Sequence, residues 1–164
     1  MKTNSNARRH TDDSARSAGG QTTPVTIHES NSVPAEGPAA SAAANRAWWD
    51  ANAQEYYADH GTTLGDADLL WCPEGLREAE AGLLGDVRGL DVLEVGCGAA
   101  QGARWLTTQG AVVTAFDVSM GQLEQARELD ARTGVTVPRV VQAAAQRLPF
   151  ASATFDIGMS AFRA

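Results

Sequence analysis

The chain has 164 residues, of which 43% are hydrophobic and 20% charged, and its formal net charge is −7. This composition is typical of one soluble domain and excludes fibrous, collagen-like and membrane-spanning classes. The acidic balance, with no Lys/Arg cluster after Arg46, excludes a protein that binds nucleic acid through its phosphates. Cys72 and Cys97 have no metal-ligand or disulfide-framework spacing, so we expect no metal site and a cytoplasmic location.

Residues 1–44 are rich in Ser, Thr, Ala, Asn, Gly and Pro, and their large aliphatic residues are Val25, Ile27 and Val33. Such a segment buries too little apolar surface to offset the entropy of ordering it. Arg8 and Arg9 are followed by polar residues instead of an apolar stretch, which is not an export signal. The sequence therefore predicts a disordered head over residues 1–44.

Residues 45–90 are expected to form an N-terminal helical lid. The segment after Arg46 lacks Gly and Pro until Gly61, which is expected to end its helix. The face of this helix is expected to hold Trp49, Ala53 and Tyr56 or Tyr57. Pro73 suits the first turn of a second helix, closed by Gly85, whose apolar positions are Leu76, Ala79 and Leu83.

Residues 91–164 alternate between strand and helix patterns. Strands are predicted at 92–95, 112–116, 140–141 and 155–159. Helices are predicted at 99–108 and from Ser119 to about residue 131, the second one beginning with a capping box made by Ser119 and Gln122. This alternation favours an α/β fold with a parallel sheet and right-handed crossovers.

The first predicted strand leads into a turn that holds Gly96 and Gly98. Glycines at this point allow the backbone to approach a ligand closely, although a tight turn without a ligand uses them equally well. Asp117 lies about 20 residues later, where an acidic residue accepts hydrogen bonds from the ribose of an adenosine cofactor. The alternative for Asp117 is a cap or first-turn role before the helix that follows.

The turn itself distinguishes between adenosine cofactors. A dinucleotide site needs a third glycine at the position of Gln101, whereas Gly102 lies one residue too late. Glu94 would repel a pyrophosphate but can pair with an ammonium, directly or through water. The residues therefore favour S-adenosylmethionine, and a nicotinamide-dependent oxidoreductase is the weaker alternative.

The segments "LEVGCG" (93–98), "FDVS" (116–119) and "LPF" (148–150) with "FD" (155–156) resemble class I S-adenosylmethionine-dependent methyltransferases of the methyltransferase-11 type. The segments "RAWWDANAQEYYADHG" and "WCPEGLREAE" are similar to the helical lid of an actinobacterial branch. The resemblance implies a Rossmann-like, doubly wound parallel sheet with strand order 3-2-1-4. It also implies S-adenosylmethionine as cofactor and methyl transfer to a small-molecule acceptor as the reaction.

The resemblance also assigns roles to residues. It implies that the turn with Glu94, Gly96, Cys97 and Gly98 contacts the methionine part of the cofactor, and that Asp117 holds the ribose. It implies that Val118 packs against adenine. Where the family carries an Asp that binds the adenine amino group, this chain has Ala144, so the ring is expected to contact the backbone of Ala145 and Gln146 instead. No catalytic residue is assigned, and His60 is either a general base or a surface histidine.

The resemblance stops at Ala164, whereas the family continues with a further helix, a fifth strand and an antiparallel pair. We therefore expect a truncated, poorly stable core over residues 91–164 that is catalytically silent, with its fourth strand open to self-association at the sheet edge. The alternative function is a non-catalytic, cofactor-binding remnant. No nucleic-acid or membrane partner is expected.

Overall fold

The computed structural model describes residues 37–161. Its elements are α1 (Pro38–Leu64), α2 (Glu78–Ala81), β1 (Asp91–Val95), α3 (Gln101–Thr108), β2 (Val112–Asp117), α4 (Met120–Thr133), β3 (Arg139–Gln142) and β4 (Ile157–Met159). Most of the expected disordered head lies outside the described residues. Its last part differs from the expectation, because residues 38–44 form the first turns of α1.

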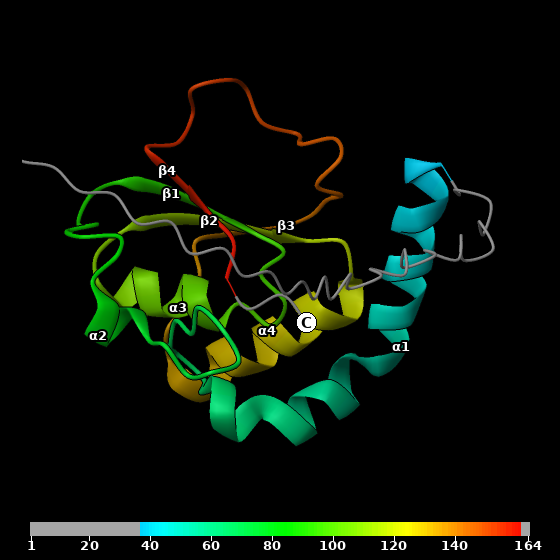
Figure 1. Ribbon diagram of the computed structural model, residues 1–164, viewed down its shortest axis with the longest axis horizontal. Coiled ribbons are helices and arrows are strands. Elements are labelled where there is room, and N and C mark those ends of the chain that lie inside the picture. Colours follow the sequence, from blue (N-terminus) through cyan, green and yellow to red (C-terminus); the bar gives the residue numbers. More distant parts are fainter. Residues whose placement is uncertain (1–36, 162–164) are drawn as a thin grey trace, which may run out of the picture. The chain divides into compact units, whose positions relative to one another are not determined.

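The four strands form one parallel sheet in the order β3-β2-β1-β4, which confirms the fold predicted from the sequence (Figure 1). In the register of the sheet, Leu93 of β1 lies between Thr114 of β2 and Gly158 of β4. Since every strand runs in the same direction, the turns that leave β1 and β2 meet at one edge of the sheet.

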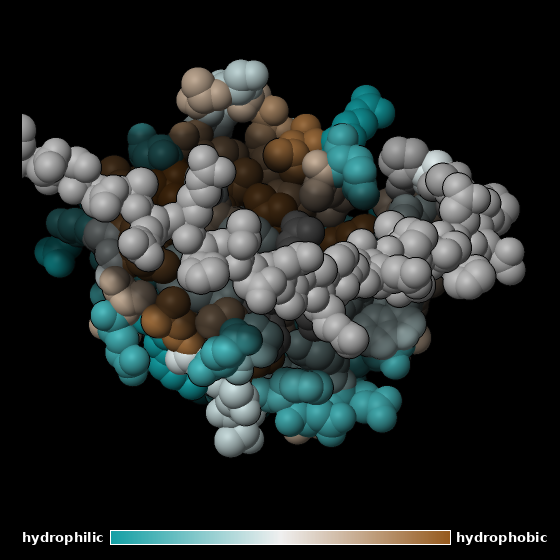
Figure 2. Space-filling view, in the orientation of Figure 1, coloured by the Kyte–Doolittle hydropathy of each residue, from teal (hydrophilic) through white to brown (hydrophobic). Residues whose placement is uncertain are grey.

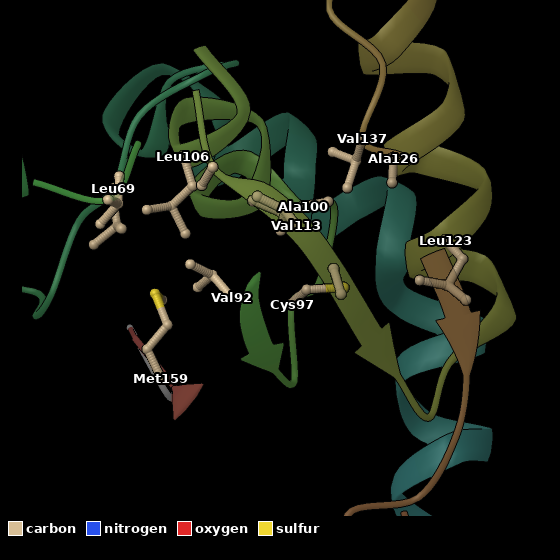
Figure 3. Packing of buried hydrophobic residues seen from close by; sticks show 14 residues of the cluster. Leu69, Val92, Cys97, Ala100, Leu106, Val113, Leu123, Ala126, Val137 and Met159 are labelled. Carbon is tan, nitrogen blue, oxygen red and sulfur yellow. The ribbon is translucent and has the colours of Figure 1, made fainter. Parts of the chain in front are cut away.

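Helices α3 and α4 pack against the same face of the sheet (Figure 1). Apolar residues of the strands alternate toward this face, and Val92, Val113 and Ala115 are each completely buried there. They contact a cluster that includes Leu106 of α3 and Leu123 of α4 (Figure 3). This core holds the strand ends and the helix starts in fixed positions relative to one another.

Phenylalanine side chains cover part of the opposite face. The ring of Phe116 lies 6.2 Å from that of Phe150, which lies 5.3 Å from that of Phe155. Strand β4 begins at Ile157 and not, as predicted, at Phe155, because Phe155 precedes the pairing with β1 and packs edge-on against Phe150. Figure 2 shows hydrophobic residues gathered in the upper part of the view and hydrophilic ones along the lower edge.

The predicted end of the lid helix at Gly61 is wrong, since α1 continues to Leu64. Gly61 is buried inside the helix, where a Cβ would come within 2.8 Å of the Tyr57 ring. The glycine thus serves close packing and not termination. Gly65 ends the helix instead, with φ of 72° and its N–H donating to the Gly61 carbonyl.

The predicted second lid helix is also largely wrong. Only Glu78–Ala81 is helical, and Leu76 and Leu83 are 44% and 64% exposed. The buried Glu78 carboxylate accepts hydrogen bonds from the backbone N–H groups of Leu83 and Leu84 and from the Trp71 indole. Because a side chain satisfies these backbone donors, the chain turns where a helix would otherwise continue.

Helix α1 lies directly against the N-terminus of α4. The Asp50 carboxylate accepts hydrogen bonds from the Ser119 hydroxyl at 2.7 Å and from the Gly121 N–H at 3.0 Å. A Cβ on Gly121 would lie 3.0 Å from the Asp50 carbonyl oxygen, so the glycine permits this close approach. The Ser119 hydroxyl in turn accepts from the Gln122 N–H, as the capping box predicts.

We expect Asp50→Ala to lower the free energy of unfolding by about 1 kcal/mol near pH 7, the usual value of a lost cap. The hydrogen bond from Ser119 is the main reason that the pKa of Asp50 is lowered. A lowered pKa contributes stability above the unfolded-state value, and this stability is lost as the pH falls below about 4. Urea unfolding at several pH values measures the effect.

The matched control is Asp59→Ala, which removes an exposed carboxylate from the same helix. It should change the free energy of unfolding by less than about 0.5 kcal/mol. Equal losses for the two variants at pH 7, or a loss for Asp50→Ala that persists at pH 2, would contradict the capping role.

None of the helices within residues 37–161 is both long and apolar enough to cross a membrane.

Candidate functional site

A cavity of about 330 Å³ lies where β1 and β2 end. The turn after β1, the end of β2, the inner face of α1 and the loop after β3 all contribute to its walls. All of the residues that the sequence analysis named as cofactor contacts line it: Glu94, Gly96, Cys97, Gly98, Asp117, Val118, Ala145 and Gln146. The fold thus brings these residues together around one space.

The turn after β1 is held by the end of β2. Gly96 and Gly98 have φ values of 66° and 54°, which favour glycine, and Ala100 adopts the same region with φ of 57°. The Cys97 N–H donates to the Phe116 carbonyl at 2.9 Å. Holding Ala100 in this conformation costs about 1 to 2 kcal/mol. The turn is therefore shaped at some expense to stability, which is typical of functional sites.

Asp117 has the local role predicted before α4 and also lies in the wall of the cavity. Its Oδ2 accepts from the Gly98 N–H and its Oδ1 from the Ser119 N–H, both at 2.9 Å. The bond to Ser119 is the local role expected before α4, and it occupies the N–H that the Gln122 side chain would bind in a full capping box. The carboxylate also lines the cavity, and its remaining lone pairs can accept from hydroxyl groups.

Glu94 is the most unusual group in the cavity. The residue is 5% exposed, and its Oε2 has no hydrogen-bond partner among the described residues. Burial raises the pKa of Glu94 to about 8, although the Ala103 N–H and the Arg104 guanidinium both lower it. A buried carboxyl oxygen without a partner is costly, and a ligand that donates to it would remove that cost.

Gly102 explains how Glu94 fits, and sequence reasoning missed this role. A Cβ on Gly102 would lie 2.5 Å from Glu94 Oε1 and 3.5 Å from Leu69 Cγ. The glycine that is one residue too late for a dinucleotide site therefore provides room for the Glu94 carboxylate at the start of α3. The signal in the sequence is the pairing of the acidic residue in the strand with this late glycine.

Helix α1 forms an aromatic wall of the cavity. Trp49 and Tyr56 line the cavity, and their rings meet edge to face at 5.2 Å. Tyr57 also lines the cavity, while its hydroxyl donates to Asp66 at 2.6 Å. His60 does not line the cavity; its exposed ring stacks on Tyr56 at 4.3 Å, and its Nδ1 contacts the Tyr56 carbonyl. The surface alternative for His60 therefore fits its position better than a general-base role.

The loop after β3 closes the cavity on the side of β2. Residues 143–146 line the cavity with small side chains and Gln146, and Ala144 supplies no carboxylate. The Ala143 N–H donates to the Asp117 carbonyl at 2.9 Å, and the Gln142 amide donates to the Val118 carbonyl at 3.1 Å. These bonds fix the loop beside the residues expected to hold the ribose and adenine.

Arg104 joins the segments that carry the site. Sequence reasoning also missed this role, because arginines on helices are usually exposed. Its side chain is completely buried and forms an ion pair with Asp130 at 2.8 Å. It also donates to the carbonyl groups of Asp66 at 2.6 Å and Ala126 at 2.9 Å. Arg104 thereby ties together the loop after α1, helix α3 and helix α4.

The core of the chain is similar to domains of known proteins. Residues 93–162 match the protein family described as the methyltransferase domain. The malonyl-[acyl-carrier protein] O-methyltransferase of Pseudescherichia vulneris is 38% identical over 77 residues, which are 47% of this chain and 29% of that enzyme. Residues 93–162 of this chain are therefore similar to a methyltransferase domain. The chain spans less than a third of the length of this curated relative.

Solved structures agree on the fold. Magnesium protoporphyrin IX methyltransferase (ChlM) from Synechocystis PCC 6803, with bound SAH, has a TM-score of 0.53 at 16% identity, covering 73% of this chain and 57% of that one. The [4+2]-cyclase SpnF has a TM-score of 0.54 at 19% identity, covering 70% and 47%. At these identities the similarity concerns the fold alone, which is the Rossmann-like architecture expected from the sequence.

Proposed function

We propose that the cavity binds S-adenosylmethionine and that the domain serves methyl transfer to a small-molecule acceptor. The observation that carries this proposal is the unpartnered, buried Oε2 of Glu94 in the cavity wall. The ammonium of the cofactor can donate hydrogen bonds to this oxygen, and its positive charge would be the counter-ion that an ionised Glu94 lacks. Gly102 supports the assignment, because it leaves room for the carboxylate at the start of α3.

The charges of the cavity wall support this cofactor over a dinucleotide. The ionisable carboxylates of the described lining are Asp68, Glu94 and Asp117, and that lining contains no Lys, Arg or His. A pyrophosphate needs cations or free N–H groups, and the ionised carboxylates of this wall would repel it. S-adenosylmethionine carries an ammonium and a sulfonium and has no phosphate, so the same wall attracts it.

Bound S-adenosylmethionine would supply an electrophilic methyl group for in-line displacement by the acceptor. The protein contributes position and exclusion of water. In this proposal Glu94 and the turn at Gly96 and Gly98 hold the methionine end, and Asp117 holds the ribose. Trp49 and Tyr56 cover the site from the lid helix. No side chain of the described residues needs to act as a general base.

Calorimetric titration of the full chain with S-adenosylhomocysteine and with NAD tests the cofactor assignment. The charges of the wall predict binding of S-adenosylhomocysteine and at least tenfold weaker binding of NAD, since a repelled charge costs more than about 1.4 kcal/mol here. Tighter binding of NAD would overturn the proposal.

Asp117→Asn is expected to weaken S-adenosylhomocysteine binding by at least about tenfold, because hydrogen bonds to a charged group contribute about 1.5 to 3 kcal/mol. The amide can accept only through one atom, so it also loses one of the bonds to the Gly98 and Ser119 N–H groups. The matched control is Asp156→Asn, since Asp156 accepts from the Asp91 N–H at the opposite end of β1. An affinity that changes equally in both variants would leave Asp117 with the local capping role alone.

A second candidate function is cofactor binding without methyl transfer. Ala144 favours it, because the carboxylate that the resemblance led us to expect near the adenine is absent from this part of the cavity wall. Binding of S-adenosylmethionine without release of S-adenosylhomocysteine in the presence of acceptors would support this alternative.

A further inference from the structure

Glu94 has no counter-ion within hydrogen-bond distance in the described structure. The positive charge of Arg104 lowers the pKa of Glu94. Its guanidinium, however, pairs with Asp130 and donates hydrogen bonds to the carbonyl groups of Asp66, Ala99 and Ala126. No hydrogen bond joins Arg104 to Glu94. The guanidinium therefore acts on Glu94 only through space.

The other groups around Glu94 make its ionisation more difficult. Asp117, at the end of the adjacent strand, is a second carboxylate, and its negative charge raises the pKa of Glu94. Cys97, in the turn after β1, is buried, and burial raises the pKa of its thiol well above its usual range, so the thiol stays neutral and supplies no counter-charge. The loop before α2 contributes the apolar side chain of Leu69. From α3 the contribution is the Ala103 N–H, one neutral donor.

An ionised Glu94 in the ligand-free protein would thus be a buried charge with one neutral donor and an unpartnered oxygen. Transfer of such a charge from water is costly, and a carboxyl group avoids this cost by keeping its proton. The raised pKa of Glu94 agrees with this geometry. The arrival of an ammonium would reverse the balance, since an opposite charge in contact favours the carboxylate.

We propose that Glu94 is protonated in the ligand-free protein and transfers its proton to solvent when the ammonium of the cofactor binds, so that cofactor binding releases about one proton. The balance is Glu94–COOH plus R–NH3⁺ giving Glu94–COO⁻ paired with R–NH3⁺, plus one H⁺ taken up by the buffer. This inference rests on the proposed function and adds a pH-dependent step to it.

The proposal predicts how affinity depends on pH. Below about pH 8 each unit of acidification should weaken binding roughly tenfold, because the proton competes with the ammonium for the carboxylate. Above about pH 8 the Glu94 carboxyl is already ionised, so the affinity should level off until the α-amino group of the ligand loses its own proton at higher pH.

Calorimetric titration of the full chain with S-adenosylhomocysteine at pH 7, in buffers with different heats of ionisation, counts the protons released. We expect a value near one. Methylthioadenosine, which has the same adenosine but no ammonium, is the matched ligand and should release none. Glu94→Gln should bind S-adenosylhomocysteine without release and without the loss of affinity below pH 8.

The possible results separate the two proposals. Absence of S-adenosylhomocysteine binding at every pH would overturn the cofactor assignment and this inference with it. Binding without proton release, or the same release with methylthioadenosine, would overturn this inference and leave the cofactor assignment standing. If Glu94→Gln does not fold, the comparison of the two ligands on the unaltered chain still decides the question.

Discussion

Gly102→Ala is expected to destabilise the protein and to weaken cofactor binding, although alanine is the better helix former. In an open helix position this change would gain about 1 kcal/mol. Here the new Cβ would lie 2.5 Å from Glu94 Oε1 and 3.5 Å from Leu69 Cγ. To avoid this clash the Glu94 carboxylate would have to shift into the cavity that it lines and away from the Ala103 N–H, so the clash should outweigh the helix gain. We expect a net loss of about 1 to 3 kcal/mol.

The effect on binding should be larger than the effect on folding alone explains. Displacing the Glu94 carboxylate removes a charge-assisted contact, so S-adenosylhomocysteine affinity should fall by about 10- to 100-fold. Urea unfolding and calorimetric titration of the same variant measure the two losses separately.

Gly158→Ala is the matched glycine control. Gly158 is exposed in β4, a Cβ added to it would meet no atom within 4 Å, and its backbone does not require a left-handed conformation. The change should be neutral or stabilise the protein by up to about 1 kcal/mol. An increase of stability in Gly102→Ala, with unchanged affinity, would show that Glu94 does not depend on this space.

Arg104→Met is expected to cost about 3 to 5 kcal/mol, the usual result of removing one partner of a buried ion pair. The change leaves the Asp130 carboxylate and the carbonyl groups of Asp66 and Ala126 without their donor. Since domains are stable by only about 5 to 15 kcal/mol, this loss should lower the midpoint of urea unfolding strongly. Far-UV circular dichroism follows the transition.

Arg132→Met is the matched surface control. Arg132 also pairs with an aspartate, Asp66, at 2.6 Å, but its side chain is 51% exposed. Exposed ion pairs contribute little to stability because solvent screens them, so this variant should unfold nearly like the unaltered chain. A loss in Arg104→Met no larger than that in Arg132→Met would mean that the buried network is not what joins α3, α4 and the loop after α1.

The shared fold does not by itself decide the reaction. ChlM and SpnF are similar to this chain in architecture, yet one is named a methyltransferase and the other a cyclase. What favours methyl transfer here is the combination of the family match over residues 93–162 with the acidic wall of the cavity. The charges of that wall are therefore the property to test first.

The sequence determined the parts of this protein that depend on local pattern. Alternation of strands and helices predicted the parallel sheet and its order, because right-handed crossovers leave few other arrangements. The spacing of Gly96, Gly98 and Asp117 predicted which residues would meet, because parallel strands end at the same edge of the sheet. These features follow from residues close together in the chain.

Only the tertiary structure decided the features that depend on side-chain packing and hydrogen-bond partners. Gly61 lies inside a helix, where it leaves room for the Tyr57 ring one turn earlier, and Glu78 ends a helix by accepting from backbone N–H groups of the next loop. Gly102 makes room for Glu94, and Arg104 is buried because three segments supply its acceptors. The physical reason is that burial and hydrogen-bond partners are properties of the packed chain, so the same glycine or arginine has a different role in each environment.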